Sequence, residues 1–329
     1  MKSMNTTRRN FIQATAAGAA ISMIPGAAVA ANYPERPINL TLGFPAGGGA
    51  DNLCRPIADR VEKIIGRPII FDYKTGAGGL IAAEAVAKAP ADGYHFTFMD
   101  IAIFAYMPHM RRVSYDPLKS FIPIVNMGQS PYAFVAAKDM PFSNMNELVA
   151  YAKANPNKLS CGSGGVGTPH QLIAELFKLR TGITMKHVPF QGGTASLTNL
   201  SGGHVDLVVS PVSSLVPFLQ GDRVKPLGVT SARRATALPN VPTVQEQGFP
   251  DFDASPWTIF AMPARVPAEP VEILRNAIHK TFEDRELVAL LAQRGAENVG
   301  GMSVAEMTRR IEVDHEKWGE VIRKAEIKI

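Results

Sequence analysis

Two glycine-rich segments contain the residues whose types and spacing could do chemistry. Gly47-Gly48-Gly49 follows an apolar run over residues 38–44 and precedes Asp51. Gly162-Ser163-Gly164-Gly165-Val166-Gly167-Thr168 follows a second short apolar run and precedes Pro169, which suits the first turn of a helix. A glycine loop at a helix N-terminus exposes backbone N–H groups where the helix dipole is positive, so it can bind an anion. The alternative is a plain strand-to-helix turn, in which glycine only permits positive φ.

His170 is the side chain beside the second segment that could take part in this chemistry, since it falls in the first turn of the helix that follows. A ligand contact and a surface or capping histidine are both open for it. The segment also matches the dinucleotide pattern G-x-G-x-x-G between a strand and a helix. That pattern requires an acidic residue about 20 positions on, and no Asp or Glu lies between Glu175 and Asp206. We therefore expect no nucleotide cofactor and assign both segments to one anionic ligand.

Catalytic and metal-binding patterns are missing from the sequence. The nucleophile pattern G-x-S-x-G fails at Ser163, because Cys161 stands two places before it. The seven histidines form no HExxH motif and no other recognisable pair, and no Cys/His cluster has the spacing of metal ligands. The paired carboxylates that a hydrolase would use are not found either. The sequence therefore predicts a binding protein without catalytic residues, metal or cofactor.

The elements that must position these segments alternate between strand and helix from residue 31 onward. Strands are predicted over residues 38–44, 68–73, 95–99, 121–128, 132–137, 159–161, 186–188, 207–210 and 225–230. Helices are predicted over residues 51–65, 80–88, 144–154, 169–179, 194–200, 271–282, 285–294 and 304–325. Such alternation predicts an α/β fold with mostly parallel sheets.

The first thirty residues have the features of an export signal. Thr7-Arg8-Arg9-Asn10-Phe11 is a twin-arginine signature, an apolar run of small residues follows, and Ala28-Val29-Ala30 resembles a cleavage site. An N-terminal membrane anchor is the alternative, but the run is short and is broken by Pro25. We expect residues 1–30 to be a twin-arginine signal peptide that is cleaved on export to a bacterial periplasm.

The charge of the remaining chain argues against a nucleic-acid partner. Cleavage removes Lys2, Arg8 and Arg9 but no acidic residue, so the net charge falls from +5 to about +2. A nucleic-acid binder would show a clustered basic face instead. No other stretch approaches the ~18 apolar residues that a membrane span needs. The 299 residues that remain are enough for two modest domains.

The chain has two cysteines, Cys54 and Cys161, each close to one of the glycine-rich segments. The periplasm permits disulfides, so a bridge between them is one possibility. The favoured interpretation is two buried thiols, one in a helix and one in a strand.

Motifs in a fixed order make the chain resemble the substrate-binding receptors of tripartite tricarboxylate transporters, also called the Bug family. The resemblance covers nearly the whole chain after residue 30. The motifs that carry it are Tyr33-Pro34-Glu35-Arg36-Pro37-Ile38, Phe44-x-Ala46-Gly47-Gly48-x-x-Asp51-x-x-x-Arg55, Gly76-Ala77-Gly78-Gly79, Ala89-Pro90-Ala91-Asp92-Gly93-Tyr94, the second glycine segment, His187-Val188-Pro189-Phe190-Gln191-Gly192, Leu238-Pro239-x-Val241-Pro242-Thr243 and Trp257.

The resemblance implies a type II periplasmic binding protein fold, with two α/β lobes and a ligand cleft between them. Residues 31–131 and 250–329 would form the first lobe, and residues 132–249 the second. The implied function is capture of a small organic carboxylate by hinge closure and delivery to the permease subunits of a tripartite tricarboxylate-type transporter. A receptor that signals to a sensor kinase and a periplasmic hydrolase are the alternatives. A monomer is expected.

The ligand-binding residues are carried over from the family's motifs. The first lobe would contribute Phe44, Ala46, Gly47, Gly48 and Asp51, and the second lobe Ser163, Thr168, His170, Gln191 and Gly192. Asp51 would act as an N-cap that fixes the loop, and Arg55 would form an internal ion pair beside it. The ligand would be a di- or tricarboxylate, an aromatic acid or an acidic amino acid. Ala50 stands where the family commonly has Ser or Thr, which is consistent with a less charged or more apolar acid.

Overall fold

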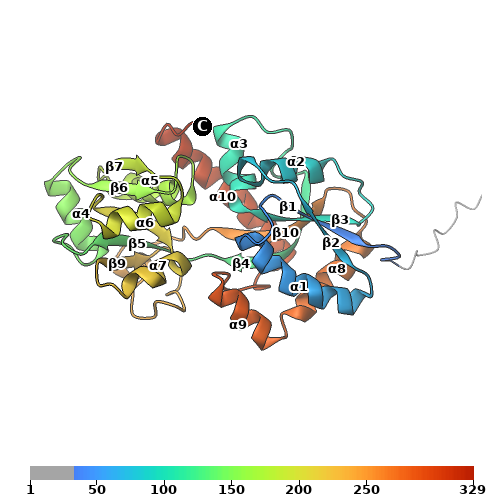
Figure 1. Cartoon of the computed structure of the whole chain (residues 1–329). Helices are drawn as coiled ribbons and strands as arrows, with labels where there is room; N and C mark the ends of the chain where they lie inside the picture. The colour runs from blue at the N-terminus through green and yellow to red at the C-terminus, as the bar shows by residue number, and fades with distance from the viewer. Residues whose placement is uncertain (1–32) are drawn as a thin grey trace, which may run out of the picture. The chain divides into compact units, whose positions relative to one another are not determined.

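The computed structural model describes residues 33–329, which contain two mixed β-sheets of five strands each, flanked by helices (Figure 1). The predicted signal peptide lies outside the described residues. No helix within residues 33–329 is long and apolar enough to cross a membrane.

The first sheet has the strand order β2-β1-β3-β10-β4 and forms the core of the first lobe. Its strands are β1 (Ile38–Leu42), β2 (Ile69–Tyr73), β3 (His95–Asp100), β4 (Phe121–Gln129) and β10 (Trp257–Pro263). The helices around it are α1 (Gly49–Ile65), η1 (Ala77–Gly79), α2 (Leu80–Ala87), η2 (Ala102–Tyr106), α3 (Met107–Met110), α8 (Ala268–Thr281), α9 (Arg285–Gln293) and α10 (Val304–Lys324).

The second sheet has the strand order β7-β6-β8-β5-β9 and forms the core of the second lobe. Its strands are β5 (Tyr132–Ala137), β6 (Ser160–Ser163), β7 (Lys186–Pro189), β8 (Leu207–Pro211) and β9 (Val224–Val229). The helices around it are α4 (Met145–Ala154), α5 (Pro169–Thr181), α6 (Gly193–Ser201), α7 (Val212–Leu219) and η3 (Gln245–Gln247).

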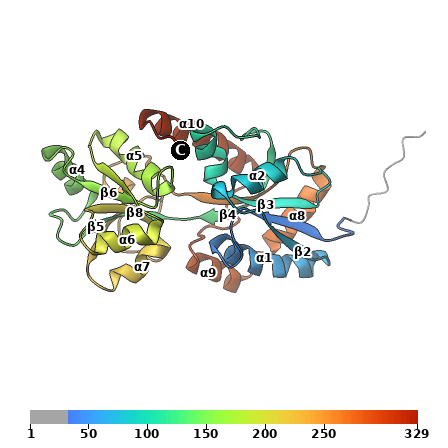
Figure 2. The ribbon, with the colours of Figure 1, turned by 45° about the horizontal axis from the view of Figure 1, so that its top comes forward.

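The chain crosses between the sheets twice, and each crossing places one antiparallel strand in a sheet. Residues 129–132 lead from β4 into β5, and residues 230–256 lead from β9 back to β10 (Figures 1 and 2). Strand β10 is antiparallel to β3 and β4, and β5 is antiparallel to β8 and β9. The other four strands of each sheet run in one direction, as predicted. The two crossings are joined by hydrogen bonds from Ser130 N to Pro256 O at 2.7 Å and from Thr230 N to Tyr132 O at 2.8 Å.

Most predicted strands and helices are present, but the sequence patterns predict neither β10 nor α7. Apart from Thr258, the β10 sequence is apolar and lacks the alternation that marks a half-exposed strand. Helix α7 is short and contains Pro217. The lobe boundaries given above stay a prediction.

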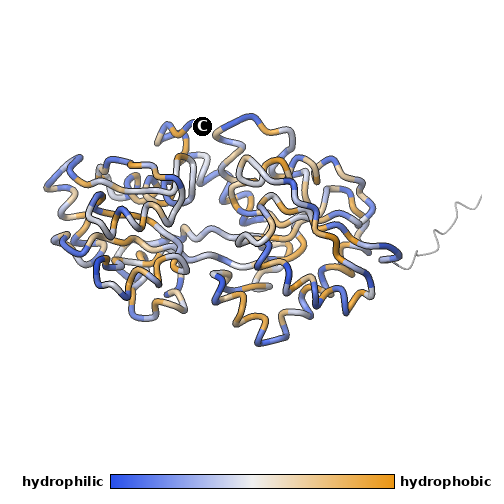
Figure 3. Tube along the Cα trace, in the orientation of Figure 1, coloured by the Kyte–Doolittle hydropathy of each residue, from blue (hydrophilic) through white to orange (hydrophobic). Residues whose placement is uncertain are grey.

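Buried apolar side chains hold each lobe together. The β1 side chains Ile38, Leu40 and Leu42 are fully buried, as expected for alternate residues on the covered face of a strand. Strand β5 turns Phe134 toward Phe177 of α5, at 4.9 Å between ring centroids. Apolar residues concentrate in the strands. Along the helices, apolar residues alternate with polar ones (Figure 3). These cores fix the strand ends from which the glycine loops emerge.

Candidate functional site

The first glycine loop lies at the carboxyl end of β1 and leads directly into α1. The N-cap of α1 is Gly48, with extended backbone. A Cβ at Gly43 would overlap the Cα of Gly79, so glycine at both positions lets this loop pack against the loop before α2. The Phe44 ring lies 3.6 Å from the place a Cβ of Gly79 would take. Two glycine loops and Phe44 therefore meet at one edge of the first sheet.

Asp51 anchors this loop, although not as the predicted N-cap. The prediction is wrong in position, because α1 begins at Gly49, two residues earlier than expected, with Gly48 as its N-cap and Asp51 in its first turn. Its Oδ2 accepts hydrogen bonds from Gly47 N at 2.8 Å and Arg55 Nε at 3.0 Å, and its Oδ1 accepts one from the Tyr73 hydroxyl at 2.7 Å. The predicted Arg55–Asp51 ion pair is thereby confirmed.

The environment of Asp51 keeps it ionised. Burial by itself raises the pKa of Asp51, but hydrogen bonds from Gly47 N, Tyr73 and Arg55 outweigh burial and hold that pKa below its usual value. The Asp51 carboxylate thus accepts the Gly47 N–H, and the Gly48 N–H donates to Pro45 O at 3.1 Å, so both N–H groups already have acceptors. The first-turn N–H groups from Gly49 onward have no intrahelical acceptor and remain for an anion.

The second glycine loop has an equivalent position in the second lobe. It follows β6 and precedes α5, whose N-cap is Thr168. Strands β6 and β7 are parallel neighbours, so the loop after β7 lies beside it. Gly192, the N-cap of α6, donates its N–H to Gly164 O at 3.3 Å. Two helix N-termini therefore converge at this edge, which is the edge where open α/β sheets bind ligands.

His170 fills the space between these two helix N-termini. A Cβ at Gly193 would lie 2.6 Å from His170 Nε2, and a Cβ at Gly164 would lie 3.1 Å from its Cε1. Both ring nitrogens are buried, and neither has a hydrogen-bond partner among residues 33–329. Burial lowers the pKa of His170 to about 4, so the ring is neutral at pH 7. A neutral imidazole offers one donor and one acceptor, and here both await a partner.

The hydroxyls predicted to bind ligand are engaged within the loop. Ser163 is 1% exposed, and its Oγ lies 2.6 Å from His187 Nε2. The same oxygen accepts a hydrogen bond from Gly165 N at 3.1 Å. Thr168 Oγ1 donates to Gly165 O at 2.7 Å. These contacts set the shape of the loop. No local sequence pattern predicts the Ser163–His187 pair, because only the β6–β7 register brings the two residues together.

The predicted site residues thus form two groups, one in each lobe. Phe44, Gly47, Gly48 and Asp51 lie together at the edge of the first sheet, with Ala46 exposed on the same loop. Ser163, Thr168, His170 and Gly192 lie together at the edge of the second sheet, with Gln191 exposed beside them. Within residues 33–329, no hydrogen bond or ion pair joins the first group to the second.

Asp100 and Tyr132 are two polar residues at these edges that the sequence analysis did not identify. Asp100 ends β3, the parallel neighbour of β1, and Tyr132 begins β5 in the other sheet. The Tyr132 ring packs edge-on against His170, with 5.4 Å between the ring centroids. No local pattern marks either residue. Asp100 is one carboxylate after an apolar strand, and its position depends on sheet order.

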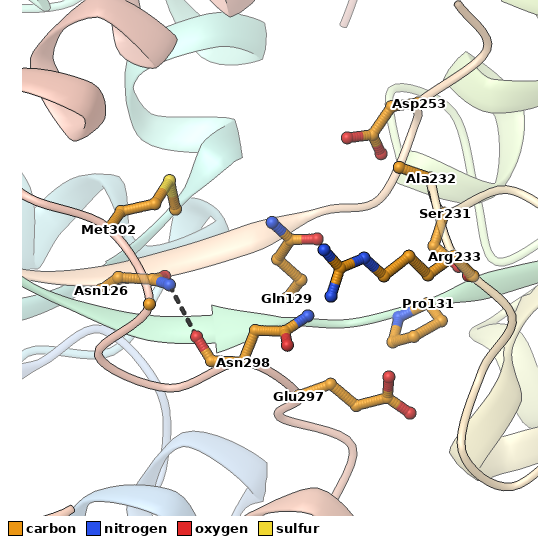
Figure 4. Close-up of a pocket in the computed structure, with 11 residues that line it drawn as sticks. Asn126, Gln129, Pro131, Ser231, Ala232, Arg233, Asp253, Glu297, Asn298 and Met302 are labelled. Carbon is orange, nitrogen blue, oxygen red and sulfur yellow. Dashed lines mark hydrogen bonds between the residues drawn. The ribbon is translucent and has the colours of Figure 1, made fainter.

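The crossing segments enclose a separate polar cavity of about 290 Å³. Arg233 reaches from the chain after β9 toward Gln129 and Asn298 (Figure 4). Gln129 ends β4, and Glu297 pairs with it along the free edge of that strand. The cavity therefore lies on the far side of the crossing strands from the glycine loops. None of the ten predicted site residues lines it.

The chain resembles proteins of known family. The model described as "Tripartite tricarboxylate transporter family receptor" matches residues 53–327. A Cupriavidus necator protein described as a "UPF0065 protein in gbd 5'region" is 33% identical over 282 residues, or 84% of this chain and 85% of that protein. The structure of R. palustris Rpa4515 with adipate is 32% identical, covers 90% of this chain and 99% of its own, and has a TM-score of 0.73. MatC (Rpa3494) from Rhodopseudomonas palustris with bound malate is 25% identical, covers 88% and 100%, and has a TM-score of 0.70.

Proposed function

Because the chain belongs to the tripartite tricarboxylate transporter receptor family, we propose that it captures a small organic carboxylate in the periplasm and delivers it to membrane permease subunits. Export by the twin-arginine signal would place it there before capture. The observation that carries the proposal is the set of helix N-termini at the carboxyl edges of both sheets. Helices α1, α5 and α6 each begin there beside a glycine loop.

The proposed binding residues act mainly through the backbone. N–H groups of the first turns of α1, α5 and α6 would receive the carboxylate oxygens. Phe44 would supply an apolar wall, and the two free ring nitrogens of His170 would complete the polar contacts. Asp51 would act indirectly, since its carboxylate is already saturated by Gly47, Tyr73 and Arg55.

Capture would proceed by closure of one lobe on the other. The lobes are joined by two crossing segments, and such segments are where hinge motion concentrates. A ligand held by amides of both lobes binds the closed form more tightly than the open form, so it shifts the population toward closure. The permease subunits would then recognise the closed form.

A dicarboxylate of four to six carbons is the first ligand class to test. The structurally similar R. palustris proteins are described with adipate and with malate. Both acids have two carboxylates, which suits a site with amide donors on each lobe. Thermal denaturation of residues 31–329 with and without each acid tests this. Ligand at 100 times its dissociation constant adds about 2.7 kcal/mol of stability, which raises the Tm by a few degrees.

Gly49→Val tests the location of the site. A Cβ at Gly49 meets no atom within 4 Å, so the side chain fits the loop while covering the amides behind it. Gly48→Val would test the site less directly, because its Cβ would lie 3.0 Å from Pro45 O and would disturb the loop itself. We expect Gly49→Val to lose the ligand-induced rise in Tm and to keep the Tm of the free protein. Gly221→Val, at an open position in the second lobe, is the matched control. Unchanged affinity in Gly49→Val would contradict the site assignment.

A further inference from the structure

Asp100 lies at the same sheet edge as the first glycine loop. Strands β1 and β3 are parallel neighbours, with Thr41 paired to Thr97, so the carboxyl ends of both strands lie at the same edge of the sheet. Asp100 also pairs with Thr258 of the crossing strand β10. The segment after Asp100 reaches the glycine loops, because Ile103 Cδ1 lies 3.6 Å from the place a Cβ of Gly79 would take. Asp100 therefore stands beside the proposed anion site, next to the crossing strand.

The carboxylate of Asp100 has backbone partners but no cation. Its Oδ1 accepts the Ala102 N–H at 2.9 Å. None of the ion pairs formed within residues 33–329 includes Asp100. Burial raises the pKa of Asp100 to about 6, and hydrogen bonds from the N–H groups of Ala102 and Ile103 offset burial only in part. At pH 7 Asp100 is still mostly an anion, and a desolvated anion is stabilised by an opposite charge.

The charge of Asp100 acts on tyrosines of both lobes. After burial itself, the Asp100 charge is the main influence that raises the pKa of Tyr132, and it also contributes at Tyr106 and Tyr115. The Tyr115 hydroxyl donates to Ile103 O at 2.6 Å, and the buried Tyr106 hydroxyl has no hydrogen-bond partner in the described part of the chain. Phenols are neutral at pH 7 and cannot neutralise a carboxylate. Tyr132 also packs against His170 beside the second glycine loop.

We propose that Asp100 binds a positively charged nitrogen of the ligand, so that the captured solute is a zwitterionic amino acid with a second carboxylate. The proposal rests on the proposed function, because the carboxylates of the same ligand occupy the helix N-terminal amides. The two charge types then have separate partners: amides for the carboxylates and Asp100 for the ammonium. An acid without the ammonium would bring negative charge close to Asp100 and leave that carboxylate unpaired.

Matched ligand pairs that differ only in the ammonium group test this. Residues 31–329 are titrated calorimetrically with succinate and L-aspartate, glutarate and L-glutamate, and adipate and L-2-aminoadipate. We expect the amino member of at least one pair to bind at least tenfold more tightly than its plain acid. In Asp100→Asn this preference falls to less than threefold, because the neutral amide keeps an oxygen for the Ala102 N–H but attracts the ammonium far less.

Asp116→Asn is the matched control variant. Asp116 also accepts backbone N–H groups just after itself, from Leu118 at 2.9 Å and Lys119 at 3.2 Å, but it is exposed. We expect it to keep the wild-type preference. Thermal denaturation of both variants without ligand separates lost recognition from lost folding.

The outcomes distinguish this inference from the proposed function. Tighter binding of a plain acid, or a preference for the amino member that Asp100→Asn leaves unchanged, would overturn the role of Asp100 and leave the carboxylate receptor intact. If malate bound more tightly than both succinate and L-aspartate, the recognised group would be a hydroxyl and not an ammonium. That result would also overturn the role of Asp100. Binding of no member of the three pairs would overturn the proposed function for this ligand class, and the inference with it.

Discussion

His170 Nε2 lies only 2.6 Å from the place where a Cβ of Gly193 would stand. The imidazole is thus pressed against the first residue of α6, and a glycine is required there. This contact ties the N-termini of α5 and α6 into one unit.

Gly193→Ala should therefore destabilise the second lobe by about 1–3 kcal/mol, the usual range for overpacking. The methyl group must displace the ring, which also disturbs the proposed ligand contacts. The Tm of the variant, measured with and without ligand, checks both effects. In a His170→Ala background the same substitution should cost less, because the ring that it displaces is gone. An equal loss of Tm in both backgrounds would show that the ring is not the obstacle.

The neutral state of His170 predicts a pH dependence of stability. Burial places its folded pKa at about 4, below the unfolded value near 6.5, so the folded state binds fewer protons. The stability that this provides is fully present above pH 6.5 and is lost as the pH falls toward 4, with a slope of at most about 1.4 kcal/mol per pH unit. Urea denaturation of wild type and His170→Gln at pH 7, 6, 5 and 4.5 measures it.

The difference in slope between those two proteins isolates His170. Burial also lowers the pKa of His109, His187 and His279, but their contributions remain in both proteins. The exposed His204→Gln is the control substitution. Parallel stability curves for wild type and His170→Gln would contradict the buried neutral ring.

Asp51→Asn should weaken ligand binding although Asp51 does not touch the ligand in the proposed site. The change removes the charge from a buried group that Gly47, Arg55 and Tyr73 all hydrogen-bond, which costs about 1–3 kcal/mol. The loop that presents the α1 amides then loses its anchor. We expect a lower Tm together with at least tenfold weaker binding by calorimetry. Asp59→Asn, exposed on the same helix, should change neither.

Ala232→Trp should tighten ligand binding through the hinge. Ala232 lines the cavity behind the crossing strands, which residues of both lobes enclose. A bulky side chain there pushes the lobes apart at the back and so favours closure over the glycine loops. A shift of ~1.4 kcal/mol toward the closed form corresponds to roughly tenfold tighter binding. Calorimetry measures this, with the exposed Ala268→Trp on α8 as the control. Weaker binding would place the cavity on the closing side of the hinge.

The sequence by itself determined the α/β fold class, the family and the identity of the glycine loops. Each of these follows from residue patterns that are local in the sequence. Apolar runs mark the strands, Pro169 and the glycines mark the starts of helices, and the family motifs occur in order along the chain. Cys54 and Cys161 likewise lie as predicted, as buried thiols in a helix and a strand. Burial raises the pKa of Cys161 to about 12, which makes it a poor nucleophile.

Only the tertiary structure decided which residues meet. Ser163 reaches His187 through the register of β6 and β7, and Asp100 reaches the glycine loops through the order of strands in the first sheet. Asp51 is a loop anchor and not the N-cap, because α1 begins at Gly49, two residues before its predicted start, and Gly48 is its N-cap. Side chains in each of these contacts come from segments tens of residues apart or depend on where a helix starts. Such distances follow from packing, which local residue patterns do not encode.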